Sequence, residues 1–284
     1  MNRIFVSFIR IKIIICVLVL SILFSCSLPR TLYNNADFLV INWFDAYFEL
    51  NNQQYSDLRN GIKKLFKWHR ESELPRVVLF LGELRLRYEK GLKEEDIDWT
   101  RAQLKDFWVR ILNHIERDLA SLLLTIEDSQ VLKMESKLLE RDDLLIEQSK
   151  MNTDELHEHI LDWLYGILED WLGNLNYNQK LQISNWVKPD PYWIAVKLRN
   201  RKKIQIGLVD LLKSKKSLKE NLHSWLYNPE LYWTKEFKDY FEVKKQEWKD
   251  TILIIDTVTL PHQRKQGMDE LQGYIDDFDV LIKN

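Results

Sequence analysis

The feature that most constrains this chain is a series of apolar stripes with helical spacing. Between residues 104 and 123, large apolar side chains recur every three or four positions, which is the spacing of one face of an α-helix. Similar stripes cover residues 156–172, 208–226, 237–252 and 271–282, and a thinner one covers 131–145. No sustained alternation with period two, the pattern of a half-buried strand, is visible. The sequence therefore predicts an all-α fold, a multi-helix antiparallel bundle of amphipathic helices.

A recurring phrase predicts where helices begin. Leu50–Gln54 and Leu175–Gln179 both place an asparagine three residues before a glutamine, directly after a leucine. This spacing suits a capping box, in which each of the two side chains accepts a hydrogen bond from the other residue's backbone N–H. Residues 126–130 and 260–263 are looser versions, and Pro261 suits a first helical position. We expect these four segments to be the tops of helical hairpins.

Two of these phrases suggest related halves. At an ungapped offset of 125 positions, eight identities occur among 32 aligned positions, pairing Asp45 with Asp170, Leu50 with Leu175, Asn51 with Asn176, Gln54 with Gln179, Asn60 with Asn185, Lys63 with Lys188, Trp68 with Trp193 and Arg76 with Arg201. Internal duplication and shared cap chemistry both explain them. Pro189 and Pro191 lack counterparts and are expected to break the second helix.

We expect no sharp domain boundary in the chain. A polar break at 148–154 is the clearest boundary, and no low-complexity linker is visible. We predict a signal peptide over 1–25, a first helical half over 26–150 and a second over 151–284, the two halves forming one continuous helical body.

The first 25 residues predict export. Their only charges are basic (Arg3, Arg10 and Lys12) and precede a short apolar run, as in a secretory signal. The run ends in Leu23-Phe24-Ser25-Cys26, which resembles the lipobox of bacterial lipoproteins, although Phe24 is larger than is usual there. The resemblance implies cleavage before Cys26 and a diacylglycerol on its thiol, at the periplasmic leaflet of the outer membrane. An uncleaved signal anchor, or secretion with Cys26 as a free thiol, is the alternative.

Composition then excludes several classes of partner and cofactor. Cleavage removes 25 of 284 residues and leaves 38 Lys and Arg against 43 Asp and Glu, so nucleic acid is not expected as a partner. Cys16 lies in the signal, so no cysteine is left beside Cys26 for a disulfide or a thiolate metal site. We predict no cofactor and no metal.

A second resemblance begins at Cys26. Arg30, Tyr33-Asn34 and Asp37, then Trp43, Asp45 and Trp68-His69-Arg70, are similar to a family of Gram-negative lipoproteins catalogued only as a domain of unknown function. The resemblance implies an all-helical lipoprotein and brings no catalytic residues. From it we predict a possible interaction surface that comprises Asp37, Trp43, Asp45, Trp68, His69 and Arg70.

The side chains suited to chemistry do not form a known constellation. His157 and His159 are two positions apart, so on a helix they point in different directions, on a face we expect to be solvated. A serine, a histidine and two carboxylates lie within residues 68–73 without a Gly-x-Ser-x-Gly elbow. We therefore predict a non-enzyme; Asp37 or Asp45 converging with His69 and Arg76 in a cleft would indicate otherwise.

Two functions remain. The first is a membrane-anchored, non-enzymatic interaction or scaffold protein with an envelope protein as partner. The alternative is a carrier or binding module for a lipid or another apolar ligand. Residues 38–48, apolar nearly all round, are either an internal helix or a contact surface near the membrane. An apolar cavity of ligand size would favour the carrier, and a filled core would favour the scaffold.

Overall fold

The computed structural model describes residues 33–140 and 142–283, and within these residues every regular element is helical, as predicted. The helices are α3 (Ala36–Phe48), α4 (Asn52–Trp68), the π-helical turn η1 (His69–Glu73), α5 (Leu74–Glu89), α6 (Glu94–Thr125), α7 (Asp128–Glu140), α8 (Asp143–Lys150), α9 (Thr153–Leu172), α10 (Tyr177–Trp186), α11 (Pro191–Lys213), the 3-10 turn η2 (Lys215–Ser217), α12 (Leu218–Tyr227), the 3-10 turn η3 (Pro229–Tyr232), α13 (Lys235–Val258) and α14 (Pro261–Lys283).

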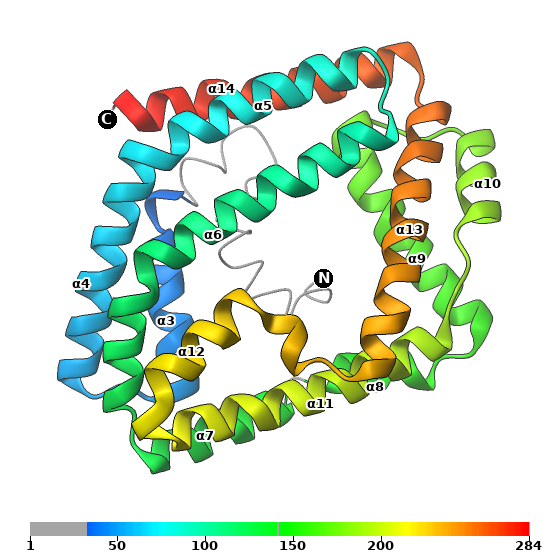
Figure 1. The fold of residues 1–284 in the computed structure, drawn as a ribbon. Helices are drawn as coiled ribbons and strands as arrows, with labels where there is room; N and C mark the ends of the chain where they lie inside the picture. Colours follow the sequence, from blue (N-terminus) through cyan, green and yellow to red (C-terminus); the bar gives the residue numbers. More distant parts are fainter. Residues whose placement is uncertain (1–32, 141, 284) are drawn as a thin grey trace.

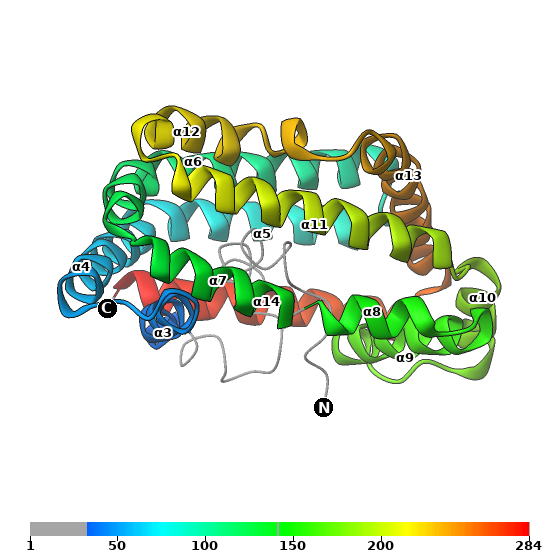
Figure 2. The same ribbon diagram turned by 90° about the horizontal axis from the view of Figure 1, so that it is seen from below.

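The helices form a four-sided frame (Figure 1). One side contains α3 and α4, the next α5 and α14, the third α9, α10 and α13, and the fourth α7, α8 and α11. The long helix α6 runs across the frame and packs on α4 and α12. Figure 2 shows the frame from below, with α11 lying above α7 and α8.

Packing crosses the division near residue 150, which falls between α8 and α9. Helix α5, from the first half, lies along α14, from the second. In return α11, from the second half, lies along α7 and α8, from the first. Each half therefore supplies one helix to a side of the frame that the other half completes.

The four segments join consecutive helices as expected, but not all of them are hairpin tops. Helices α3 and α4 pack side by side, whereas α6 and α7, and α13 and α14, meet at corners of the frame. Asn51 and Gln54 form the capping box that starts α4, with both hydrogen bonds at 3.0 Å. Asn176 and Gln179 form the equivalent box at the start of α10, also at 3.0 Å. Helix α14 begins at Pro261, its expected first residue, and the 126–130 segment joins α6 to α7.

The two interhelical connections within each half are joined by a buried pair of glutamines. In the first half Gln54 and Gln130 bond each other, Gln54 Nε2 donates to the carbonyl of Thr125 at 2.8 Å, and Gln130 Nε2 donates to that of Glu49 at 3.2 Å.

In the second half Gln179 and Gln263 bond each other in the same way. Gln179 Nε2 donates to the carbonyl of Val258 at 2.8 Å, and Gln263 Nε2 donates to that of Asn174 at 3.0 Å. Because these bonds join helices far apart in sequence, cap chemistry alone does not explain them, and they favour internal duplication. The offset is 125 positions for Gln54 and 133 for Gln130.

Four details differ from, or refine, the sequence-based expectations. The 131–145 stripe is interrupted between α7 and α8, and the 208–226 stripe is interrupted at Ser214, within the short connection that the polar residues 213–217 predict. The expected break at Pro189 and Pro191 is confirmed, since α10 ends at Trp186. Helix α3 is not an internal helix, because Phe38 and Leu39 are 58% and 52% exposed.

Candidate functional site: an apolar pocket beside a polar corner

The predicted interaction residues on α3 mainly stabilise local structure. The Asp37 carboxylate accepts a hydrogen bond from the N–H of Phe38 at 2.8 Å, and the Asp45 carboxylate accepts one from that of Leu50 at 2.9 Å. The Trp43 ring packs on Tyr47, with 4.9 Å between ring centroids.

The predicted residues at the end of α4 hold the start of the described chain. His69 is buried, and its Nδ1 is hydrogen-bonded to the Tyr33 hydroxyl at 3.0 Å. Arg70 Nη2 donates to Asn34 Oδ1 at 3.2 Å, while Trp68 stacks on His114. The structure therefore corrects the prediction for His69, which is too buried to contribute to a surface.

Burial sets the protonation of this contact. Loss of solvent lowers the pKa of His69 to about 4, so the imidazole is neutral at pH 7. Burial also raises the pKa of Tyr33 to about 12, because it outweighs the opposing effect of the Arg70 charge. The role of Tyr33 was not apparent from the sequence, although Tyr33 is among the residues that carry the family resemblance. Cys26, the predicted lipidation site, lies outside the described residues.

The described residues do not bring the candidate chemical groups together. Asp37 and Asp45 bond to backbone N–H groups, His69 pairs with Tyr33, and Arg76 lies beside Glu73. Within residues 33–140 and 142–283, no three side chains of the metal-ligating types lie close enough together to hold an ion.

The two histidines of α9 differ from the sequence-based expectation. His157 and His159 are half-buried rather than on a solvated face, and Gln148 Nε2 is 3.2 Å from His159 Nε2.

Within the part of the chain that the structure describes, no helix is both long enough and apolar enough to cross a membrane.

An apolar pocket of about 370 Å³ lies where α5, α6, α9, α13 and α14 meet. The sequence left an apolar cavity open as an alternative but did not indicate its position, because its walls come from helices spread over two hundred positions of the chain. Its lining residues are mostly large and apolar: Val77, Phe80, Leu81, Leu84, Tyr88, Leu92, Thr100, Leu104, Leu168, Trp171, Leu172, Ile252, Ile255, Asp256, Thr259, Gly267, Leu271, Tyr274 and Phe278.

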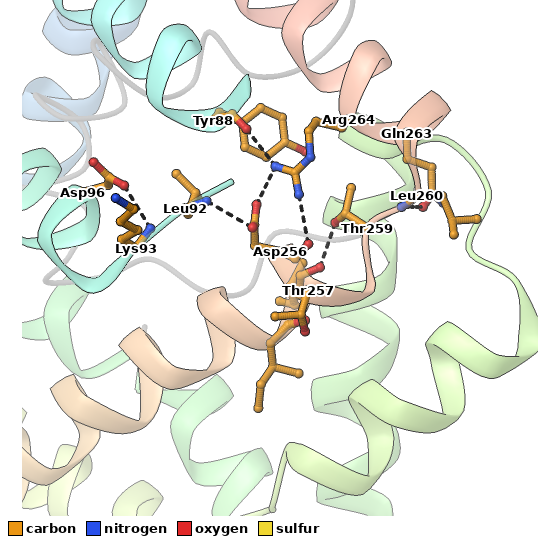
Figure 3. Close-up of polar contacts among 12 residues, drawn as sticks. Tyr88, Leu92, Lys93, Asp96, Asp256, Thr257, Thr259, Leu260, Gln263 and Arg264 are labelled. Carbon is orange, nitrogen blue, oxygen red and sulfur yellow. Dashed lines mark hydrogen bonds and ion pairs between the residues drawn. The ribbon is translucent and has the colours of Figure 1, made fainter. Parts of the chain in front are cut away.

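One end of the pocket is a polar corner built around Asp256 (Figure 3). The Asp256 carboxylate accepts hydrogen bonds from the N–H of Leu92 at 3.0 Å and from Arg264 Nη1 at 2.8 Å. Arg264 also donates to the carbonyl of Tyr88 at 2.7 Å, and its pKa is raised chiefly by its bond to Asp256. The corner therefore joins α5, α13 and α14 while leaving its polar groups partnered.

Gly267 allows the Tyr88 ring to lie in this corner. A Cβ at position 267 would be 2.9 Å from Tyr88 Cε1, which is closer than real Cβ atoms approach. Burial raises the pKa of the Tyr88 hydroxyl, so it stays protonated at neutral pH.

The equivalent corner of the other half is filled. The offset of 133 positions places Leu123, Ile126 and Met134 where the pocket corner has Asp256, Thr259 and Gly267. All three of these apolar side chains are buried, and they belong to one hydrophobic cluster. The pocket thus lies at a corner where these three positions differ between the halves.

The fold and the pocket define an all-helical protein with a candidate ligand site in its described part. A family model described as a family of unknown function (DUF6279) matches residues 46–238, and the chain belongs to this family. No curated protein and no solved structure is detectably similar to the chain.

Proposed function

We propose that the protein is a lipoprotein of the Gram-negative cell envelope whose helical body binds a hydrocarbon chain. The pocket is the observation that carries the proposal. At about 370 Å³, it falls within the range of small-molecule sites, roughly 300–1,000 Å³. Of the two functions that the sequence left open, a pocket of this size favours the binding module.

The size of the pocket suggests the size of the ligand. A methylene group takes about the volume of a water molecule, about 30 Å³, so the pocket would hold about a dozen methylenes. Each methylene moved out of water contributes about 0.8 kcal/mol, roughly 10 kcal/mol for such a chain before the cost of association. A medium-length acyl chain, or part of a longer one, is the ligand that fits.

The anchor is the second part of the proposal. Lipidation of Cys26 would hold the body at the periplasmic face of the outer membrane, since two or three acyl chains bind a membrane almost permanently. The proposal includes no enzymatic activity and no nucleic-acid partner. An envelope protein as partner remains part of it.

A hydrocarbon titration tests the binding. The mature chain would be secreted behind an ordinary signal peptide with Cys26→Ala, so that no lipid is attached. We expect added dodecane to raise the melting temperature, because a ligand that binds the folded state stabilises it. Leu84→Trp should abolish the shift by filling the pocket, whereas Leu79→Trp, at a site 74% exposed on the same helix, should leave it unchanged. Absence of a shift in the parent chain would refute hydrocarbon binding.

A scaffold role is the second candidate, supported by the exposed pair Phe38 and Leu39 on the first turns of α3. The pair follows closely on the predicted anchor, so it would lie near the membrane. Affinity purification from crosslinked cells tests this role, comparing the native protein with Cys26→Ala and with Phe38→Ser/Leu39→Ser. An envelope protein recovered in near-equal amount, and lost in both variants, would support the scaffold. No such loss would refute it.

A further inference from the structure

The start of the described chain lies next to one end of the pocket. Tyr33 is 3% exposed and packs in a hydrophobic cluster with Val77, Phe80, Tyr274 and Phe278. These four partners also line the pocket. The hydrogen bonds of Tyr33 to His69 and of Arg70 to Asn34 hold the chain at this place.

The distance from this point to Cys26 is short. Seven positions separate Cys26 from Tyr33, and at 3.3–3.6 Å per residue they span at most about 25 Å. The pocket itself runs along α5 from Val77 to Tyr88, a length of about 16 Å at 1.5 Å per residue. An acyl chain on Cys26 is therefore attached within reach of the pocket end beside Tyr33.

The charge of the pocket favours a chain whose polar end is elsewhere. The residues that line it include one acidic group, Asp256, and no basic one. The nearby Arg264 already donates to Asp256 and to the Tyr88 carbonyl. Inside the pocket the carboxylate of a free fatty acid would meet no basic lining side chain, which is unfavourable. An ester-linked or amide-linked acyl chain carries no such charge.

We propose that the occupant of the pocket is an acyl chain carried by Cys26 of the same molecule. The inference rests on the proposed function, because it requires both the lipid on Cys26 and a pocket that binds hydrocarbon. One acyl chain would then hold the N-terminal segment against the body, while the remaining chains stay in the membrane.

Site-specific photocrosslinking of the full lipidated protein in its membrane tests this proposal. A diazirine-bearing amino acid is placed at Leu84, which lines the pocket, or at the exposed Leu79 as a control. Trypsin cuts after Arg76 and Arg85, so both positions lie in one peptide, and it also releases the lipidated peptide that ends at Arg30. Mass spectrometry then identifies what is attached to the pocket peptide.

The outcomes separate the two proposals. We expect the pocket peptide from the Leu84 protein to be joined through an acyl chain to peptide 26–30, in protein that migrates as a monomer, and we expect this product to be lost with the probe at Leu79. A phospholipid or free fatty acid on the pocket peptide, or the product only at dimer mass, would overturn the same-molecule inference and leave the binding function intact. No acyl adduct at Leu84 would overturn both.

Discussion

The two equivalent corners of the frame are built alike but packed differently. In the first half, Leu123 and Val131 are both buried, with exposed fractions of 6% and 0%. The offset of 133 positions places Asp256 and Arg264 at these positions in the second half, where they form an ion pair at 2.8 Å. An apolar contact in one corner is therefore replaced by a charged one in the other.

The comparison shows that two similarly built halves can keep the same junctions between helices while their apolar packing differs. The glutamine pairs and helix caps are the same in both halves, so the helices meet in the same way. The apolar filling differs, since Met134 is 2% exposed in the filled corner and its counterpart is Gly267. The Asp256–Arg264 ion pair and the absence of a side chain at Gly267 thus leave space in the second half. The corresponding space in the first half is filled by apolar side chains.

The largest loss of stability is expected from removing the ion pair between Asp256 and Arg264. Asp256→Leu, which copies the filled corner, leaves the half-buried Arg264 without its carboxylate, and loss of one partner of such a pair costs about 3–5 kcal/mol. The double variant Asp256→Leu/Arg264→Val should recover most of this loss, because it recreates the apolar pair. Urea unfolding measures both, and a double variant no more stable than the single one would contradict the equivalence of the corners.

A large effect is also expected from opening the filled corner. Met134→Ala should reduce the free energy of unfolding by about 2–5 kcal/mol, since it removes buried volume. Gly267→Ala should change it by less than about 1 kcal/mol, because the helix gains about that much from alanine while the Tyr88 ring must shift. Equal losses for the two variants in thermal unfolding would mean that the corners are packed alike.

The third difference between the halves is a buried histidine. His69 has Ile194 as its counterpart at the 125-position offset, and its pKa is lowered to about 4. Below pH 6.5 the unfolded chain binds a proton that the folded chain accepts only near pH 4. Stability is therefore complete above pH 6.5 and falls by about 3 kcal/mol as the pH drops to 4.

His69→Ile should remove this part of the pH dependence, measured as the unfolding free energy at pH 7, 5.5 and 4. The control is His262→Gln, at an exposed site. We expect this variant to keep the dependence of the unfolding free energy on pH, which separates the effect of His69 from general acid denaturation. A slope unchanged by His69→Ile would show that His69 is not the group responsible.

The smallest effect is expected where the halves agree. Gln130→Ala and Gln263→Ala each remove a buried side chain that donates to a backbone carbonyl, at a cost of about 1–3 kcal/mol. Double-mutant cycles with Gln54 and Gln179 should give similar coupling energies in the two halves. Coupling in one half alone would argue against equivalent junctions.

Much of the fold could be predicted from local sequence. Apolar periodicity and cap residues act within one helix or one turn, so the stripes and the Asn51 and Asn176 caps located the helices and their starts. The interruption between α7 and α8 escaped notice, because the apolar pattern continues through it, whereas the polar run 213–217 indicated the one at Ser214. The 125-position offset indicated related halves but not the exchange of α5 and α11 between them.

The candidate site could not be predicted in the same way. The pocket depends on a glycine, an ion pair and the packing of five helices, and no single segment carries that pattern. The resemblance drew attention to Tyr33 and His69, yet only the structure shows that they contact each other. The two residues are 36 positions apart in sequence, so no local pattern predicts their contact. Burial of the contact is what lowers the pKa of His69.

Photocrosslinking at two equivalent positions tests the central claim, that one corner binds hydrocarbon and the other is filled. Leu84 lines the pocket, and its counterpart at the 125-position offset, Val209, is buried in the filled cluster. A diazirine-bearing residue at Leu84 should give an acyl adduct in the native envelope, and the same residue at Val209 should give only crosslinks within the protein. Acyl adducts at both positions, or at neither, would contradict the account.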